Sequence, residues 1–223
     1  MLEGVGIVEP TLRSRVAYHF SEVIGGGDSY KKDENLYLPE GPEPDDVDSP
    51  AHTRWLREVA NRDKVIESFK AIENRREPFI QHYVNKGEPI PVWAAIEVVS
   101  FGTLSRFLRA LRDKSVLRPV TKSLELEDEA KLLQAVQNIS FLRNIAAHHG
   151  RLWNRSFDGY VTLPQIALKV KRQYVKPRTS AAMLTLLAGL VDQIEKNDDY
   201  STLLLDQVHS MPDFVDGYYS PIL

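Results

Sequence analysis

The chain has 223 residues, of which 43% are hydrophobic and 26% charged, and its formal net charge at pH 7 is −3. This length allows one domain with a sizeable core or two small ones, and the composition is ordinary for a soluble globular protein. The absence of cysteine excludes disulfides and thiolate metal sites. No apolar run approaches the ~20 residues that cross a bilayer, and no signal-peptide pattern is present, so we expect a cytoplasmic protein with no membrane partner.

Charge is spread unevenly along the chain. The segment 33–48 holds seven acidic residues and no basic one, and without it the remainder is net positive. A second segment, 169–178, is basic. A local basic surface that follows a nucleic-acid backbone is therefore compatible with the acidic total, and an ordinary solvated face is the equally weighted alternative. The basic residues concerned are Lys169, Lys171, Arg172, Lys176 and Arg178.

In the first part of the chain, apolar residues recur at helical spacing in three places. They predict helices over 11–24 and 52–74 and a short helix over 78–84, with Pro78 in the first helical position. Between the first two helices, residues 25–50 are rich in glycine, proline and acids. This composition predicts a long exposed acidic loop.

The middle of the chain contains the predicted central helix. Residues 92–112 are apolar on nearly every side, which is typical of a buried helix, and Glu97 is conspicuous within it. The segment 114–122 is expected to be a loop. A long helix is then predicted over 127–149, ended by Gly150 as a C-cap.

The last part of the chain combines irregular segments with two further helices. Residues 155–165 are expected to be irregular or briefly extended, a helix capped by Thr179 or Ser180 runs to about residue 194, and 200–208 form a last helix. The sequence shows no internal repeat and no alternating strand pattern of any length. We therefore expect an all-α protein with a single helical domain over 1–223.

The stretch from Phe141 to Asn154 concentrates polar chemistry at the end of the helix predicted over 127–149. It contains two arginines, two adjacent histidines and two asparagines. On an α-helix, Arg143 falls inside the apolar stripe. That stripe consists of Leu132, Val136, Ile139 and Ala146. A buried guanidinium needs a partner, so a structural ion pair with Glu97 is the alternative to a catalytic role.

Arg143 and His148 have the spacing of a pair that does acid/base work on a phosphodiester without a metal. His148 is near the helix C-terminus, where the macrodipole favours an imidazolium. A zinc site is disfavoured because His148 and His149 point about 100° apart and no third ligand has a usable spacing. Arg143 and His148 lie about 140° apart on an ideal helix. They converge if the helix end distorts, if the arginine reaches round, or if a second copy of the chain completes a composite site in a homodimer.

Three stretches of the sequence resemble motifs of one known family. The stretch 141–154 reads from Leu142 onward as Leu-Arg-Asn-x-x-x-His-His-x-Arg-Leu-Trp-Asn, and residues 91–105 read as Pro-x-Trp-x-x-x-Glu-x-x-Ser-Phe-Gly-x-Leu-Ser. Residues 12–19 are similar to the early helix of the same family. The family is that of the Abi-like (abortive infection, Abi-2) proteins of bacteria, within the HEPN superfamily, and the resemblance spans 10–155. Because the early helix usually follows several tens of helical residues, the N-terminus is expected to be shortened relative to the family.

The resemblance implies an HEPN-like helical bundle and a metal-independent endoribonuclease without a cofactor. In such enzymes the 2′-hydroxyl of RNA attacks the adjacent phosphorus and leaves a cyclic phosphate. His148 would be the general base or acid, and Arg143 would stabilise the charge on the phosphorane. Asn144 would orient the imidazole or hold the phosphate. His149 would assist catalysis, and Arg151 would bind RNA together with the basic segment 169–178.

Other interpretations of the same residues stay open. Trp153 and Asn154 are expected to pack and to reverse the chain, rather than to stack on a base. The protein could be a non-catalytic HEPN module that binds RNA, a nucleotide or a protein partner, such as an antitoxin, in a toxin–antitoxin or phage-defence system. It could also be purely structural, with Arg143 and Glu97 as a buried pair. No P-loop or other glycine-rich nucleotide fingerprint is present.

Overall fold

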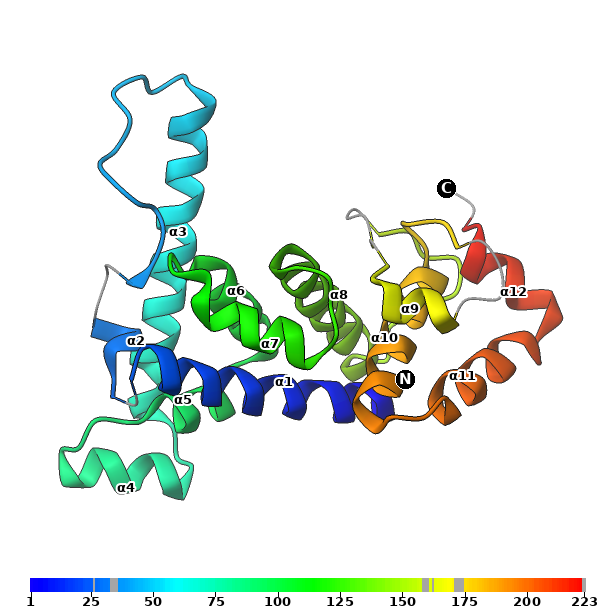
Figure 1. Ribbon diagram of the computed structural model, residues 1–223, viewed down its shortest axis with the longest axis horizontal. Coiled ribbons are helices and arrows are strands. Elements are labelled where there is room, and N and C mark those ends of the chain that lie inside the picture. The colour runs from blue at the N-terminus through cyan, green and yellow to red at the C-terminus, as the bar shows by residue number, and fades with distance from the viewer. Residues whose placement is uncertain (26, 33–35, 158–160, 162, 171–174, 222–223) are drawn as a thin grey trace. The chain divides into compact units, whose positions relative to one another are not determined.

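The computed structural model of the chain describes residues 1–223 except 26, 33–35, 158–160, 162, 171–174 and 222–223 (Figure 1). The protein is all-α, as the sequence predicted. Its described residues form helices joined by turns and loops, with isolated β-bridges and no extended strand. Among these helices there is none whose length and apolar character would let it pass through a membrane.

The helices are numbered as in Figure 1. The α-helices are α1 (Leu2–Val23), α2 (Ser29–Lys32), α3 (Pro50–Lys70), α4 (Pro78–Lys86), α5 (Val92–Val98), α6 (Phe101–Ala110), α7 (Leu117–Ser123), α8 (Glu129–Ala147), α9 (Gln165–Val170), α10 (Ser180–Glu195), α11 (Asp199–His209) and α12 (Pro212–Tyr219). Two short 3-10 helices are η2 (Ala71–Asn74) and η3 (Lys114–Val116).

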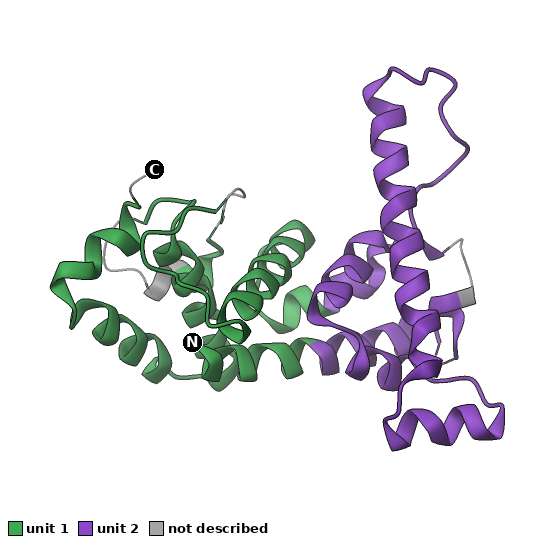
Figure 2. Ribbon diagram, turned by 180° about the vertical axis from the view of Figure 1, so that it is seen from behind, with its two compact units in different colours: residues 1–12, 120–223 green, residues 13–119 purple. Residues whose placement is uncertain are grey.

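The chain forms two compact units, coloured green and purple in Figure 2. Unit 1 comprises residues 1–12 and 120–223, and unit 2 comprises residues 13–119. Helix α1 therefore contributes its first part to unit 1 and its second part to unit 2. Each unit buries apolar side chains of its own.

Helix α1 begins at Leu2, well before the start predicted at residue 11. Val5, Val8 and Leu12 are buried at helical spacing, so the added turns have an apolar face. Pro10 lies inside the helix and is exposed. An interior proline removes one backbone hydrogen bond and argues for a helix boundary in the sequence. In the structure, burial of the apolar face outweighs that cost.

Unit 2 is built around a cluster of aromatic side chains. The ring of Phe107 in α6 lies 5.1 Å from that of Phe69 in α3 and 5.4 Å from that of Phe20 in α1. Tyr30 of α2 packs edge-on against Phe69 at 4.8 Å, and Tyr37 contacts Phe107 at 6.2 Å. Aromatic pairs at these distances favour edge-to-face packing, and they bring α1, α2, α3 and α6 together.

The segment 25–50 is only partly the exposed loop that the sequence predicted. Residues 40–49 are exposed or half-buried. Leu36 and Tyr37 are buried, however, and Tyr37 forms an isolated antiparallel bridge with Leu111. The prediction was wrong at these residues because Tyr37 completes the aromatic cluster of unit 2.

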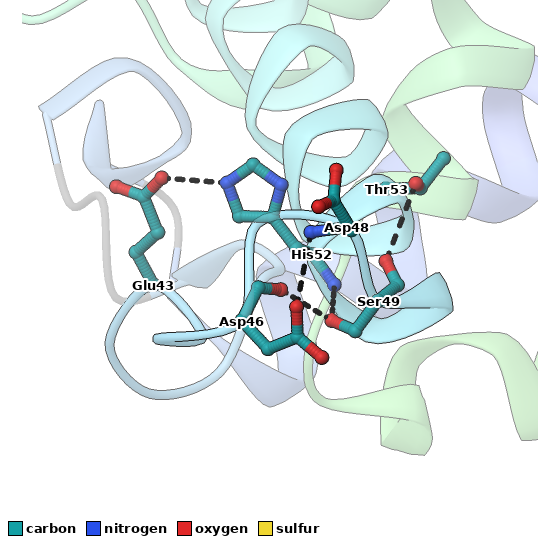
Figure 3. A network of polar contacts seen from close by, with 6 residues as sticks. All are labelled: Glu43, Asp46, Asp48, Ser49, His52 and Thr53. Carbon is teal, nitrogen blue, oxygen red and sulfur yellow. Dashed lines mark hydrogen bonds and ion pairs between the residues drawn. The ribbon is translucent and has the colours of Figure 1, made fainter.

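The acidic end of this loop is folded into a cap for α3 (Figure 3). The Oγ of Ser49 accepts the backbone N–H of His52 at 3.1 Å and donates to the carbonyl of Asp46 at 2.6 Å. The side chain of Asp46 accepts the N–H of Asp48 at 3.1 Å. Nε2 of His52 lies 2.8 Å from a carboxylate oxygen of Glu43. The bond from the His52 N–H to Ser49 satisfies a donor that the first turn of a helix leaves unpaired, and the other contacts tie the loop to this cap.

Replacement of Ser49 by alanine should lower the free energy of unfolding by about 1 kcal/mol, because the N-cap acceptor is lost. Urea unfolding followed by circular dichroism measures this change. Ser14→Ala is the matched control, since Ser14 is exposed in the interior of α1 and alanine is the better helix former there. An unfolding midpoint of Ser49→Ala equal to that of wild type would show that the cap does not stabilise the fold.

The single central helix predicted over 92–112 is two helices, α5 and α6. The chain between them is extended at Val99 and Ser100, with ψ of 154° and 152°. The Oγ of Ser100 accepts the backbone N–H of Thr103 at 3.0 Å and so begins α6 as its N-cap. The prediction was wrong because the sequence is apolar on both sides of Ser100, so the apolar pattern did not show that one helix ends before this serine and the next begins after it.

Arg13 of α1 occupies the break between α5 and α6 within unit 2. Its Nη1 donates to the carbonyl of Val99 at 2.9 Å and also to the carbonyl of Ile96. Its guanidinium carbon lies 6.0 Å from the ring centre of Phe101. Carbonyls at a helix C-terminus lack intrahelical partners. Arg13 therefore joins two of the three motifs that the sequence singled out.

The predicted loop 114–122 is largely helical, as η3 followed by α7. The side chain of Asp113 accepts the N–H of Ser115 at 2.8 Å and begins η3. Pro119 falls in the first turn of α7. Proline is tolerated there because the N–H groups of a first turn have no intrahelical acceptor. The prediction of a loop was therefore wrong, because Pro119 is compatible with the first turn of a helix.

Unit 1 is built around α10, which contacts α8, α9, α11 and α12. The Oγ1 of Thr179 accepts the N–H of Ala182 at 3.2 Å, which confirms Thr179 as the predicted N-cap. At Gly189 a Cβ atom would lie 2.6 Å from the Cα of Ala167 in α9, so only glycine allows these backbones to approach. The described part of 155–165 is irregular before α9, with an isolated bridge between Ser156 and Thr179.

Candidate active site

Helix α8 carries the polar residues that the sequence marked as catalytic. It begins after Asp128, whose side chain accepts the N–H of Lys131 at 2.7 Å. The predicted apolar stripe, Leu132, Val136, Ile139 and Ala146, is buried. Arg143 is not buried with it, because 42% of its side chain is exposed. A long arginine side chain can lay its methylenes along an apolar stripe and keep its charged end in water. The expectation of a buried guanidinium was therefore wrong.

Arg143 lies between two polar partners in unit 1. Its Nε is 3.5 Å from Oε2 of Glu9 in α1, and its Nη1 donates to Oδ1 of Asn144 at 3.3 Å. Glu9 is 17% exposed, whereas Asn144 is exposed. The carboxylate paired with Arg143 is thus that of Glu9, while the predicted partner Glu97 is an exposed residue of unit 2. Within the described residues, Nη2 of Arg143 makes no hydrogen bond.

The C-terminal end of α8 presents both histidines to solvent. His148 is the C-cap, and His149 follows in the left-handed conformation with φ of 52°. The N–H of His149 donates to the carbonyl of Ala146 at 3.1 Å, and the N–H of Gly150 donates to the carbonyl of Ile145 at 2.7 Å. This pair of bonds is a Schellman motif. The left-handed residue is therefore His149, one position before the glycine predicted to cap the helix.

Because His149 has a left-handed backbone, we expect replacement of histidine by glycine to stabilise the protein at His149 and to destabilise it at His82. His149→Gly should raise the free energy of unfolding by up to about 1 kcal/mol, because glycine adopts positive φ without the clash of a Cβ atom. The control His82→Gly, in the exposed middle of α4, should lower it by about 0.5 kcal/mol through loss of helix propensity. Urea unfolding of both variants tests the assignment. A destabilised His149→Gly protein would show that the imidazole contributes more than the strain costs.

The side chains of Arg143 and His148 are not joined by a polar contact in the described part of unit 1. Helix α8 is regular to Ala147, so the helix end does not distort in the way that convergence would require. No hydrogen bond or ion pair links the two side chains within the described residues of unit 1. The backbone N–H of His148 donates instead to the carbonyl of Asn144 at 3.1 Å.

The sequence around this helix end was compared with known families. Residues 1–154 match the family model described as Abi-like protein. The chain belongs to the Abi-like protein family. The match ends at Asn154, so it includes all of α8 and both histidines and leaves out the basic segment 169–178. Comparison with the curated proteins and with the solved structures finds no match.

Beyond α8, the Abi-like motif ends in residues that pack. The ring of Trp153 lies 5.6 Å from that of Phe214 in α12, and the guanidinium carbon of Arg151 lies 5.7 Å from the Trp153 ring centre. Asn154 has φ of 52°, and its N–H donates to the carbonyl of Gly217 at 2.9 Å. A Cβ atom at Gly217 would lie 2.2 Å from Nε1 of Trp153. These contacts agree with the expectation that Trp153 and Asn154 pack and reverse the chain.

Of the predicted RNA-binding residues of this Abi-like protein, the structure describes the side chains of Arg151 and Lys176. Arg151 is exposed, and Nζ of Lys176 donates to Oγ of Ser220 at 3.1 Å. Lys169 lies in α9, and Lys171 and Arg172 fall outside the described residues. Their role in RNA binding therefore stays a prediction. In the part of the chain that is described, no three histidine or carboxylate side chains gather as a metal site.

Sequence patterns did not point to Glu9 as a neighbour of the site. Its carboxylate orients and partly neutralises the guanidinium of Arg143, from a helix at the other end of the chain. An ion pair that is this exposed contributes little to stability, about 0–1 kcal/mol. Its larger effect is on the direction in which Arg143 points.

Proposed function

We propose that this Abi-like protein acts in abortive infection as a metal-independent HEPN endoribonuclease of the cytoplasm. The observation that carries the proposal is the exposure of Arg143, His148 and His149 at one helix end inside the region of the family match. An imidazole can accept and return a proton near neutral pH. A guanidinium matches the equatorial oxygens of a phosphorane.

The reaction would proceed by transfer within the RNA. The imidazole of His148 accepts the proton of a ribose 2′-hydroxyl, and the 2′-oxygen attacks the adjacent phosphorus. The guanidinium of Arg143 stabilises the negative charge on the phosphorane oxygens, and Asn144 holds the phosphate beside it. The bond to the 5′-oxygen of the next nucleotide breaks, and that oxygen takes a proton from a second imidazole. The products are a 2′,3′-cyclic phosphate and a 5′-hydroxyl.

The second imidazole is supplied either by His149 or by a second copy of the chain. No hydrogen bond or ion pair joins Arg143 and His148 of one chain within the described residues, which supports a composite site in a homodimer. Two copies of α8 that meet at their C-terminal ends would place Arg143 of each next to His148 of the other. A regulatory partner such as an antitoxin would then act by covering this exposed helix end.

The chemistry is tested on a short RNA of mixed sequence in the presence of EDTA. We expect cleavage to persist, the 5′ fragments to carry cyclic phosphates, and an RNA with 2′-deoxyribose at every position to stay intact. Mass spectrometry of the fragments identifies the end groups. Cleavage of the all-deoxy strand, or fragments with 5′-phosphates, would contradict attack by the 2′-hydroxyl.

One observation favours a second function, that of a non-catalytic RNA-binding module. In a single chain the guanidinium of Arg143 pairs with Glu9, and within the described residues no hydrogen bond or ion pair joins it to His148. A protein that stays monomeric would then bind a phosphate through Arg143 without cleaving it. Binding of RNA without fragments, by a protein that sediments as a monomer, is the result that this alternative predicts.

A further inference from the structure

A cavity of about 360 Å³ lies beside Asn144 in unit 1. Three residues of α8 at helical spacing, Asn138, Phe141 and Asn144, form one wall. The opposite walls come from Arg155 and Phe157, and from Met183 of α10. The volume falls in the lower part of the range of about 300–1,000 Å³ that small-molecule pockets occupy.

The wall formed by residues 155–157 is fixed in place by backbone contacts. The N–H of Phe157 donates to the carbonyl of Arg178 at 3.1 Å, and Ser156 forms an isolated bridge with Thr179. Thr179 is also the N-cap of α10. The backbone at Phe157 is therefore joined to the residues that precede and begin the central helix of unit 1.

Asn138 brings an unsatisfied hydrogen-bond donor to this cavity. The residue is 5% exposed, and its Nδ2 is buried without a hydrogen-bond partner among the described residues. A buried amide without a partner is costly, and native structures contain few of them. A ligand that carries an acceptor next to a donor would pair with both ends of the amide.

Aromatic and cationic side chains complete the lining. Phe141 is 49% exposed, although it is one of the large apolar residues of α8. The guanidinium carbon of Arg155 lies 5.9 Å from the ring centre of Phe157, at a distance typical of a cation–π contact. The cavity thus offers flat apolar surfaces, amides and one positive charge, which together fit a planar heterocycle attached to a phosphate.

We propose that this cavity binds one unpaired nucleobase of the RNA that the active site cleaves, an inference that rests on the proposed function. Single-stranded RNA is recognised by stacking of splayed bases on aromatic rings and by hydrogen bonds to their edges. Here Phe141 and Phe157 provide the stacking surfaces and Asn138 the hydrogen bonds. Asn144 lines the cavity and accepts from Arg143, so the bound base is next to the phosphate that Arg143 holds.

The pocket is tested by binding of RNA analogues that cannot be cleaved. Five 2′-O-methyl pentanucleotides carry adenine, guanine, cytosine, uracil or no base at every position, so that their phosphate charges are equal. We expect wild-type protein to bind at least one base-containing strand about tenfold more tightly than the abasic strand, which is the size of one stacking contact. Fluorescence anisotropy measures the affinities, and the free mononucleotides form a second arm that separates RNA from soluble nucleotides.

Substitutions of cavity residues test whether the preference for base-containing strands comes from this cavity. Phe157→Ala and Asn138→Ala should each remove most of the tenfold difference, and Phe141→Ala should do so at an exposed position where folding is not at risk. Phe79→Ala, at an exposed phenylalanine of α4 in unit 2, is the matched control and should bind as wild type does. The proposed base pocket would be refuted if wild type bound the abasic strand as tightly as the base-containing strands. It would also be refuted if all three cavity variants kept the preference for a base.

Failure of the pocket and failure of the proposed function give different results. If binding depended on the base but natural RNA were not cleaved, the base pocket would be supported and the ribonuclease function would be refuted. Cleavage by wild type together with equal binding of the base-containing and abasic strands would retain the ribonuclease and refute the pocket. Tighter binding of a free mononucleotide than of its pentanucleotide would contradict RNA as the ligand.

Discussion

His148→Ala should lower the rate of RNA cleavage by about 10²–10⁴-fold, the contribution of a general acid or base. The fold should be unaffected because His148 is exposed and its backbone, with φ of −99° and ψ of 15°, is accessible to alanine. Initial rates on a fluorescent RNA, with circular dichroism of each protein, measure both effects. His82→Ala removes an exposed imidazole of α4 in unit 2 and should leave the rate unchanged.

The same variant tests whether two chains share one site. If Arg143 of one chain acts with His148 of another, a mixture of the inactive His148→Ala and Arg143→Ala proteins should regain activity through mixed dimers, which contain one intact site. If each site lies within one chain, the mixture should stay inactive. Full activity of folded His148→Ala protein would refute the catalytic assignment altogether.

Arg143→Lys should reduce cleavage by about 10²–10³-fold, because lysine provides a point charge in place of the planar fork that stabilises a phosphorane. The free energy of unfolding should change by about 1 kcal/mol or less, since the pair with Glu9 is partly exposed. Steady-state rates and urea unfolding measure the two effects. Arg76→Lys, at an exposed arginine of unit 2, is the matched control.

Exchanging the charges of Glu9 and Arg143 tests whether Arg143 has a catalytic role or only a structural one. In the double variant Glu9→Arg with Arg143→Glu, the ion pair of the structure is restored with exchanged charges. Its stability should exceed that of Arg143→Glu alone, while cleavage should stay absent because no cation faces the phosphate from α8. Recovery of cleavage in the double variant would show that Arg143 acts only through the pair.

Helices with clear end signals could be predicted from the sequence. Thr179 precedes a long apolar run and does cap α10, and Pro78 begins α4. The break between α5 and α6 could not be found in this way, because Ser100 stands inside a run that is apolar on both sides. At Pro10 the sequence showed a helix breaker, and only the burial of Val5 and Val8 in unit 1 explains why the helix continues.

The sequence singled out candidate site residues, whose catalytic role stays a prediction, but it could not show which side chains contact them. The family motif pointed to Arg143 and His148, and helical geometry placed them about 140° apart, with convergence left open. Helical geometry could not show that Arg143 is partly exposed. The position of a residue around the helix axis does not determine where the guanidinium at the end of a long side chain lies. Glu9 was missed since a partner so distant in sequence is determined by tertiary packing. His149 was missed as the left-handed residue because glycine is the usual choice there.

The division of α1 between the two units has a consequence for synthesis of the protein. Residues 1–12 leave the ribosome before unit 2, but the rest of unit 1, residues 120–223, leaves it after unit 2. All of unit 2 is translated before Glu9 can meet Arg143. A nascent or prematurely terminated chain that lacks α8 therefore carries neither the arginine nor the histidines. For a protein proposed to cleave RNA, the proposed catalytic side chains therefore appear only after all of unit 2 has been made.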